Sequence, residues 1–345
     1  MNASADQPNR STPSNQQRLT CAVVVCTRKN SPLLERCLLA LRRQNPELLI
    51  LVQNGPFDDS LRRQAGDIGA IYLHEPKLGL SRARNLGLRT ASAEIVAFVD
   101  DDAEVQPGWL AAITDAFADP GVGCVFGKVI DEGSIDHYTS AAGFEISTPD
   151  GAQVRMGCPC WFEQVTMGRI GAGMNFAVRR SLLVAAGGFD ERLGLGSRIP
   201  GHEEHKAALE ILRQGAAARY LSDAVVRHAG GTRPDPVLRR RILDSAAAAA
   251  AYLVLLFAEY PELRSEVIRY FRSKVQTSTR ERMPGLPVSM RLRLGFSRVR
   301  GMGLYLVTRV QNKQGTAPSG ERAAHLQDLE VSAELSPSGG VSRHG

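Results

Sequence analysis

The chain has 345 residues, of which 43% are hydrophobic, and its formal net charge is +6. Residues 262–313 contain twelve Lys and Arg against three Glu, a balance of +9, so the remainder sums to −3. This asymmetry argues against a nucleic-acid-binding fold throughout. It favours either a local partner surface, such as anionic lipid or a phosphorylated acceptor, or a solvated basic helix without a partner.

The two ends of the chain have the composition of disordered segments. Residues 1–18 are rich in Asn, Gln, Ser and Pro, and they lack the apolar core of a secretory signal, so we expect a disordered leader. Residues 314–345 are predicted to be a mostly disordered tail. The six cysteines show no zinc-type spacing, which favours small buried side chains and a reducing cytoplasm.

Strands and helices are expected to alternate through the first third of the chain. Short apolar runs predict strands over residues 22–26, 48–52, 70–73 and 94–99. Helical spacing and turn signals predict helices from about 31 to 43, 81 to 90 and 107 to 118. This alternation is typical of an α/β fold with three layers and a mostly parallel central sheet.

The pattern is less regular beyond Gly123. Strand-like runs are expected at 124–126 and 128–130, followed by an irregular glycine-rich stretch over 131–164. A helix is predicted from His202 to Arg213, and further strands over 217–221 and 224–226 lead to His228.

The predicted strand Glu94–Val99 runs directly into Asp100, Asp101 and Asp102. Three adjacent carboxylates repel one another, and ligands gather at the carboxyl ends of strands in open α/β sheets, so this pattern indicates a site for Mg²⁺ or Mn²⁺. Because a strand alternates its side chains, we expect Asp100 and Asp102 to point one way and Asp101 the other. An acidic turn or a helix cap is the alternative.

Seven segments in a fixed order give the chain a family resemblance. They are a strand ending in Thr27, the turn Val52-Gln53-Asn54-Gly55, the segment Gly79–Gly87, the acid triplet, Gly187–Glu191, the pair Glu203-Glu204 and the strand end Val226-Arg227-His228. Together they resemble the family-2 glycosyltransferases over residues 20–230. The resemblance implies a Rossmann-like GT-A fold and inverting transfer from a nucleotide-diphospho-sugar, with a divalent metal.

The resemblance also implies roles for individual residues. Asp100 and Asp102 match the family's Asp-x-Asp motif, near the ribose and on the metal respectively, and His228 matches a position that reaches the metal in some members. The positions predicted to contact the nucleotide-sugar are Thr27, Arg28, Asn54, Arg84, Asn85, Asp100 and Asp101. Gly173–Asn175 and Gly187–Glu191 resemble the wall on the acceptor side.

Two positions depart from the family pattern. Glu204 matches the catalytic Asp that deprotonates the acceptor hydroxyl, and Glu203 is the second candidate for this base. Both acids would also suit the first turn of a helix without any catalytic role. Gln53 replaces an Asp that often reads the nucleotide base, which leaves recognition of uracil open.

These features divide the chain into four predicted segments. They are a leader over 1–18, a GT-A domain over 19–232 with a nucleotide-sugar half (19–130) and an acceptor half (131–232), a basic helical extension over 233–313, and the tail over 314–345. The stretch Ala246–Ala258 is uncharged but short for a bilayer span, so a packed helix is favoured. The stretch Arg291–Val310 mixes arginines with apolar residues, as an interfacial helix does, although three glycines interrupt the segregation.

The predicted function is therefore metal-dependent sugar transfer from a nucleotide donor to a saccharide, lipid-linked or small-molecule acceptor, in polysaccharide, glycolipid or metabolite glycosylation. We expect a cytoplasmic enzyme, with peripheral contact to the inner face of the membrane through its basic helices as an option, and no nucleic-acid partner. One alternative is a sugar-phosphate nucleotidyltransferase, although the first strand is not followed by the glycine-rich loop of such enzymes. Another is a nucleotide-sugar-binding scaffold that has lost its base.

Overall fold

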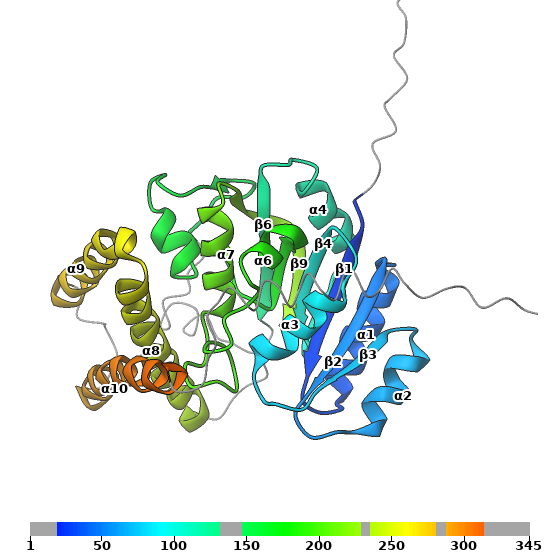
Figure 1. Ribbon diagram of the computed structural model, residues 1–345, viewed down its shortest axis with the longest axis horizontal. Coiled ribbons are helices and arrows are strands. Elements are labelled where there is room, and N and C mark those ends of the chain that lie inside the picture. The colour runs from blue at the N-terminus through cyan, green and yellow to red at the C-terminus, as the bar shows by residue number, and fades with distance from the viewer. Residues whose placement is uncertain (1–18, 132–146, 229–234, 281–287, 314–345) are drawn as a thin grey trace, which may run out of the picture.

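The computed structural model describes residues 19–131, 147–228, 235–280 and 288–313 (Figure 1). The predicted leader over 1–18 and tail over 314–345 lie outside these ranges. A central sheet with helices on both faces forms the main body, and three long helices follow it in the chain.

The amino-terminal half is a parallel sheet built from short apolar strands. β-branched and other apolar side chains fill both faces of these strands, as expected where helices cover a sheet on both sides. The strands are β1 (Cys21–Thr27), β2 (Leu48–Asn54), β3 (Ile71–Glu75) and β4 (Ile95–Asp100). The helices between them are α1 (Pro32–Arg43), α2 (Asp59–Asp67) and α3 (Leu80–Thr90).

The second half extends the same sheet with mixed strand directions. Its strands are β5 (Ala103–Val105), β6 (Val122–Asp131), β7 (Gln153–Val154), β8 (Asn175–Arg179) and β9 (Ala217–His228). Its helices are α4 (Trp109–Ala116), a π-helix (Phe162–Thr166), α6 (Arg180–Ala185) and α7 (Glu203–Arg213). The strand order is β3-β2-β1-β4-β8-β6-β9-β5, and β7 pairs with β9.

The sheet is mostly parallel, as predicted. The pairings set β1, β2, β3, β4, β6 and β9 in one direction, while β5, β7 and β8 run in the other. Two of the differences from the sequence prediction concern strands that were expected as pairs of short runs. The two short runs expected around Gly127 form one strand, β6, and those expected before His228 form one strand, β9, because the two strands pair along their whole length with a register shift at Gly127.

The side chains of β1 show how the three layers are held together. Ala22 and Val24 enter the core under α3 and α7, whereas Val23 and Val25 enter the core under α1 and α4. Helix α3 can approach β1 closely because residue 87 is glycine: a Cβ there would lie 2.5 Å from a methyl carbon of Val24. The predicted three-layer α/β/α arrangement is therefore confirmed.

The carboxyl-terminal helices lie together on one side of the sheet domain (Figure 1). They are α8 (Asp235–Glu259), a 3-10 turn (Pro261–Leu263), α9 (Arg264–Arg280) and α10 (Val288–Lys313). Glu259 of α8 joins them to the sheet domain, because it accepts hydrogen bonds from Arg192 (2.6 Å) and from Tyr305 of α10 (3.1 Å). The helical extension expected after the sheet domain is present.

Candidate active site

The acid triplet lies at the carboxyl end of β4, and its three carboxylates have three different partners. Strand β4 ends at Asp100, and the next two residues form a turn before β5, so the alternation expected through Asp102 does not continue. Asp100 pairs with Arg84 (3.2 Å), Asp101 accepts a hydrogen bond from Thr27 (2.5 Å), and Asp102 lies 3.1 Å from the Nε2 atom of His228.

Asp101 and Thr27 connect the ends of the neighbouring strands β4 and β1. Burial, together with the negative charges of its two neighbours, raises the pKa of Asp101 to about 6, although the Thr27 hydroxyl opposes this shift. Arg28 follows Thr27 and is exposed. The predicted residues Thr27, Arg28, Asp100 and Asp101 therefore lie at one edge of the sheet.

Asp102 and His228 form the pair that is best suited to a divalent cation. The antiparallel pairing of β5 with β9 places Ala103 opposite His228. The imidazole of His228 therefore lies beside Asp102, the residue before β5. Within the described ranges, no group of three or more Asp, Glu, His or Cys side chains is arranged around a common point. One carboxylate and one imidazole nevertheless fit Mn²⁺ or Mg²⁺, since these ions commonly complete their coordination with substrate phosphates and water.

Arg84 is a buried cation at the centre of the candidate site. Its side chain is 3% exposed, and the guanidinium donates to Glu203 (3.0 Å), Asp100 (3.2 Å) and the carbonyl of Gly173 (2.9 Å). The guanidinium also lies near the rings of Phe98 and Phe189. Arg84 thus connects the acid triplet to the glutamate pair. The structure does not test its predicted contact with the nucleotide-sugar.

Asn54 and Asn85 hold loops in place around the site. Asn54 donates to the carbonyl of Lys77 (2.8 Å) and accepts from the amide of Gly79 (2.9 Å), which fixes the start of α3. Asn85 donates to the Phe189 carbonyl (2.9 Å) and accepts from the Phe189 amide (2.7 Å). Their predicted contacts with the donor stay predictions.

Gln53, the departure from the family pattern, is fully buried at the end of β2. Its amide group donates to the Pro56 carbonyl and accepts from the Tyr72 hydroxyl. The Gln53 side chain therefore holds the turn after β2. Recognition of the nucleotide base at this position stays open.

Glu203 and Glu204 open helix α7, as predicted. His202 precedes them with a left-handed backbone (φ 66°), and its ring stacks on Tyr252 of α8 with 4.7 Å between centroids. One oxygen of Glu204 accepts the amide of Gly173 (3.1 Å). Glycine at 173 leaves room for this, since a Cβ there would lie 3.0 Å from the Glu204 carboxyl carbon and 3.1 Å from Arg84.

The two glutamates differ in their protonation. Burial and the neighbouring charge of Glu204 raise the pKa of Glu203 to about 8, and this outweighs the opposing effect of its ion pair with Arg84. Burial also acts to raise the pKa of Glu204, but electrostatic interactions with His205 and Arg84 outweigh it and lower that pKa. The opposite directions of these shifts make Glu204 the more acidic member of the pair.

Buried polar atoms without a hydrogen-bond partner gather around this helix start. Among the described residues they include one oxygen each of Glu203 and Glu204, the Nδ1 atoms of His202 and His205, and the hydroxyl of Tyr252. His205 uses its other nitrogen to donate to the Gly171 carbonyl (3.1 Å). Because orphaned buried polar groups are rare, their concentration here indicates a place where a polar ligand or water binds.

Tyr252 is a residue that the sequence reasoning missed. It lies in the alanine-rich stretch of α8, where composition indicates only a packed helix, yet it is fully buried against His202. A tyrosine amid alanines is a weak signal, and its position can be recognised only once α8 is seen to pack against α7.

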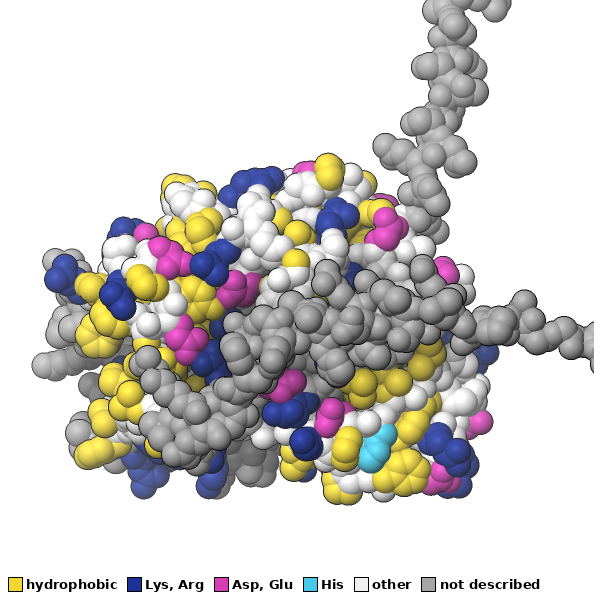
Figure 2. Space-filling view, in the orientation of Figure 1, with side chains coloured by type: hydrophobic (Ala, Val, Ile, Leu, Met, Phe, Trp, Pro, Cys, Tyr) yellow, Lys and Arg dark blue, Asp and Glu magenta, His cyan; other side chains and the backbone are white. Residues whose placement is uncertain are grey.

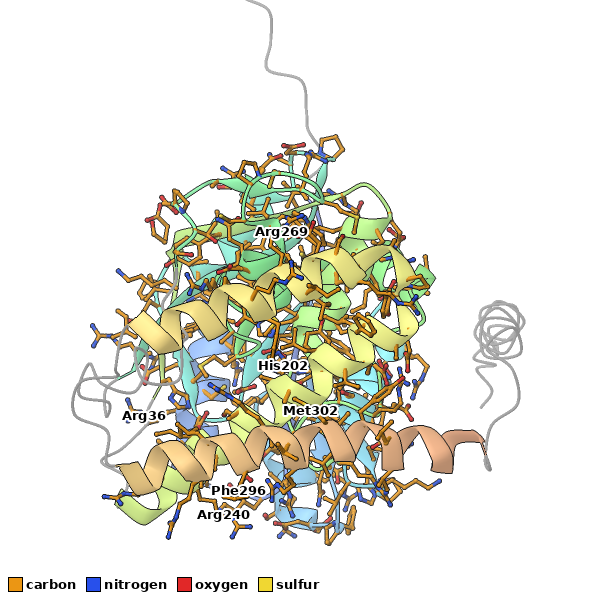
Figure 3. All side chains as sticks on the ribbon, turned by 90° about the vertical axis from the view of Figure 1, so that its left-hand side faces the viewer. Arg36, His202, Arg240, Arg269, Phe296 and Met302 are labelled. Atoms are coloured by element: carbon orange, nitrogen blue, oxygen red, sulfur yellow. The ribbon has the colours of Figure 1, made fainter. Side chains whose placement is uncertain are left out.

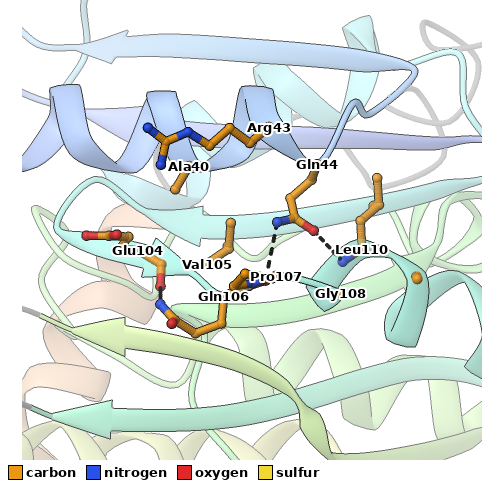
Figure 4. A pocket seen from close by; sticks show the side chains of 10 residues that line it. Ala40, Arg43, Gln44, Glu104, Val105, Gln106, Pro107, Gly108 and Leu110 are labelled. Atoms are coloured by element: carbon orange, nitrogen blue, oxygen red, sulfur yellow. Dashed lines mark hydrogen bonds between the residues drawn. The ribbon is translucent and has the colours of Figure 1, made fainter.

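A surface pocket of about 450 Å³ lies away from these residues, between α1, β5 and the start of α4 (Figure 4). Its polar groups largely satisfy one another: Gln44 donates to the Gln106 carbonyl (3.2 Å) and accepts from the Leu110 amide (3.4 Å). None of the predicted site residues lines this pocket.

The mixed sheet, with acids at the end of β4 and a glutamate pair at the start of α7, is a GT-A fold. A solved structure with this fold is the mannosyltransferase PcManGT from Pyrobaculum calidifontis in complex with GDP-Man and Mn²⁺. It matches 96% of this chain and 84% of its own, with a TM-score of 0.51 and 20% sequence identity. Residues 22–156 match the family model of glycosyl transferase family 2, which supports the predicted resemblance over this part of the chain.

Curated relatives are also glycosyltransferases. The glucosyl-dolichyl phosphate glucuronosyltransferase of Haloferax volcanii is 27% identical over 199 residues, which are 55% of this chain and 61% of that protein. The pre-mycofactocin glycosyltransferase of Mycobacterium tuberculosis is 26% identical over 250 residues, 69% of this chain and 49% of that protein. The matched region thus spans about half to three fifths of the length of these relatives.

Proposed function

We propose that this protein transfers a sugar from a nucleotide-diphospho-sugar to an acceptor hydroxyl with inversion at the anomeric carbon. The observation that carries the proposal is the Glu204 carboxylate, which one hydrogen bond from Gly173 holds in place while its second oxygen is buried and has no partner in the described part of the chain. A general base needs a fixed, ionised carboxylate with an oxygen available to the acceptor hydroxyl.

In the proposed reaction, Glu204 takes the proton of the acceptor hydroxyl as that oxygen bonds to the anomeric carbon. The bond from that carbon to the diphosphate breaks, and the nucleoside diphosphate leaves with the electron pair. Glu203 ranks after Glu204 as a candidate for the base, because Arg84 binds its carboxyl group and its pKa is raised. Arg84 positions both halves of the site, because it also binds Asp100.

We propose that Asp102 and His228, with Asp100 beside them, hold a divalent metal, Mn²⁺ or Mg²⁺. Their donor atoms suit such an ion, and PcManGT, which shares the fold, is solved with Mn²⁺. When bound, such an ion would stabilise the negative charge that develops on the leaving diphosphate. Thr27, Arg28, Asn54, Asn85 and Asp101 are proposed to surround the donor.

The proposed acceptor is a saccharide, a lipid-linked sugar or a small molecule. We propose that residues 19–130 form the half of the domain that binds the donor and residues 131–232 the half that binds the acceptor. The names of the relatives support this range of acceptors, since one acts on glucosyl-dolichyl phosphate and another on pre-mycofactocin. The cytoplasm, with peripheral contact to the membrane through the basic helices, is the proposed location.

Nucleotide binding tests the donor site and the metal together. We expect one of UDP, GDP and dTDP to bind the purified protein in the presence of Mn²⁺, and Asp102→Ala to weaken this binding by about tenfold or more. Titration calorimetry with and without Mn²⁺ measures the effect. The control is Asp67→Ala, the same change at the exposed end of α2.

Two results would contradict the metal assignment. One is equal nucleotide affinity with and without Mn²⁺, and the other is unchanged metal-dependent affinity in the Asp102→Ala variant. The absence of binding for all three nucleotides would instead favour a degenerate scaffold or a different kind of donor.

A further inference from the structure

Helix α10 exposes its largest apolar side chains. Phe296 is 74% exposed and Val299 is 66% exposed. Met302, Leu306 and Val307 are also exposed, to a smaller extent. With 3.6 residues per turn, these five positions share one side of the helix. We call them the outward face of α10. Figure 3 shows α10 lying across the surface, with Phe296 and Met302 labelled.

The opposite side of α10, which packs against α8, is small and polar. It consists of Ser297, Gly301, Tyr305 and Thr308, all of which are buried. Ser297 donates to the Leu243 carbonyl, and a Cβ at Gly301 would lie 2.1 Å from the carbonyl oxygen of Ala247. The glycine that interrupts the sequence pattern therefore allows close packing of the two helices.

The polarity of α10 is thus the reverse of that of an ordinary surface helix. In a water-exposed helix the apolar stripe faces the core and the polar side faces the solvent. Here the polar and small residues face the protein, and a contiguous apolar stripe faces outward. Such a stripe marks an interaction surface rather than a solvated one.

Arginines flank the outward face on both sides. By the same helical period, Arg298 lies on one margin of the stripe, and Arg293 and Arg300 lie on the other. All three are exposed, and Arg300 also pairs with Asp244 of α8 (2.7 Å). Apolar residues with flanking cations are the pattern of a helix that lies in the plane of a membrane interface.

Helix α9 adds to this surface. Ile268 and Phe271 are exposed beside the exposed arginines Arg269 and Arg272. Figure 3 shows α9 on the same side of the molecule as α10, and Figure 2 shows hydrophobic and cationic side chains side by side at that end.

Helix α8 has a different role. Its stretch Ile242–Glu259 is long and apolar enough to cross a membrane by length and composition. Several of its apolar side chains, however, are buried between α10 and the sheet domain, namely Ala247, Ala248, Ala251, Tyr252, Leu255 and Leu256. Packing inside the protein explains the composition of α8, whereas it does not explain the outward face of α10.

We infer that the outward face of α10, together with the exposed residues of α9 on the same side of the molecule, binds flat on a membrane that contains anionic lipids. The charge decides between this occupant and a second copy of the chain. Residues 262–313 carry a balance of +9, so two such surfaces would repel each other, whereas anionic headgroups would attract them.

This surface lies one helix away from the candidate base. Tyr252 of α8 stacks on His202, the residue before Glu203 and Glu204, and the other side of α8 carries α10. If the proposed function holds, the base is positioned near the membrane, which favours an acceptor carried by a lipid. The binding surface itself does not depend on catalysis.

Vesicle sedimentation without a donor or acceptor tests the inference on the full-length protein. We expect binding to phosphatidylcholine vesicles containing about a third phosphatidylglycerol, and at least tenfold weaker binding to pure phosphatidylcholine. Phe296→Asp should weaken binding to the anionic vesicles by about tenfold or more, since a buried Phe contributes most per residue. Arg293→Gln and Arg298→Gln should each weaken it by about fivefold.

Matched controls lie on the far side of the sheet domain. Phe57→Asp makes the same change at another exposed phenylalanine, and Arg63→Gln removes a charge from α2; neither should alter vesicle binding. Circular dichroism and thermal unfolding of Phe296→Asp should match those of the wild type, because the side chain is exposed.

Several outcomes would overturn the inference. They are no vesicle binding by the wild type, equal binding to neutral vesicles, equal loss with Phe57→Asp, or a dimer in light scattering that Phe296→Asp converts to a monomer. Activity measured on a soluble acceptor separates these outcomes from a failure of the proposed function, since such transfer requires no membrane.

Discussion

Two clusters of polar groups in the site differ in how completely they are paired. At the carboxyl end of β4, each acid of the triplet has a partner: Arg84 for Asp100, Thr27 for Asp101 and His228 for Asp102. At the start of α7, both glutamates keep one buried oxygen that no described residue hydrogen-bonds, and the Tyr252 hydroxyl likewise has no partner among the described residues.

The difference separates two tasks in one site. A fully paired buried network contributes stability and holds its members in one arrangement. An unpaired buried group costs free energy in the empty protein, and it is explained when a ligand supplies the missing partner. We therefore expect changes in the first cluster to reduce stability, and changes in the second to affect the reaction more than the fold.

The largest expected effect on stability is at Arg84. Arg84→Met would remove three hydrogen bonds at once, to Glu203, to Asp100 and to the buried Gly173 carbonyl. The free energy of unfolding should fall by about 3–5 kcal/mol, measured by urea denaturation. The control is Arg82→Met on the same helix, which breaks a more exposed pair with Glu191 and should cost less than about 1 kcal/mol. Equal losses for both variants would contradict the central role of Arg84.

A pH dependence should distinguish the two glutamates. Burial and the neighbouring Glu204 raise the pKa of Glu203 to about 8 in the folded protein, above the ordinary glutamate value of 4.5, so the folded protein binds more protons than the unfolded chain between these values. Its contribution to stability is present below the lower value and is lost as the pH rises toward 8. The Glu203→Gln variant lacks this carboxyl group, so it should not lose this stability as the pH rises.

Urea midpoints from pH 5 to pH 8 measure this effect. The stability of Glu203→Gln relative to that of the wild type should increase as the pH rises. The shift for Glu204→Gln should be smaller over this range, because Glu204 itself has a lowered pKa and only its contribution to the raised pKa of Glu203 is removed. A rise of the same size in both variants would contradict the assignment of the proton to Glu203.

The smallest expected effect is at Tyr252. Tyr252→Phe keeps the ring on His202 and removes a buried hydroxyl that has no hydrogen-bond partner in the described structure. Stability should stay the same or rise by up to about 1 kcal/mol in thermal or urea unfolding. Tyr260→Phe is the control, since it breaks a hydrogen bond to Glu210 and should lose about 1 kcal/mol. A larger loss in Tyr252→Phe than in Tyr260→Phe would show that the hydroxyl is paired.

The sequence predicted the local features of this fold and site well. The alternating strands and helices, the acids at the end of β4 and the glutamates at the start of α7 follow from short-range patterns. Long-range packing was out of reach. Arg84 meets Glu203 across 119 positions, and Tyr252 meets His202 only because α8 folds back on α7. The order of the strands, with β8 antiparallel between β4 and β6, likewise leaves no local signal.

Helix α10 is a second example of packing that the sequence alone does not predict. Its mixture of arginines and apolar residues was visible in the sequence, but the glycines obscured which face carried which residues. Only the packing of Gly301 on Ala247 shows that the apolar face points outward.

The most direct test of the central claim is to measure transfer and donor binding in the same preparation of Glu204→Gln. The variant keeps the size of the side chain and the hydrogen bond from Gly173 but cannot accept the proton of the acceptor. We predict donor affinity close to that of the wild type and a transfer rate lower by about 10²–10⁴-fold. An unchanged transfer rate in Glu204→Gln, or a complete loss in Glu203→Gln alone, would contradict the assignment of Glu204 as the base.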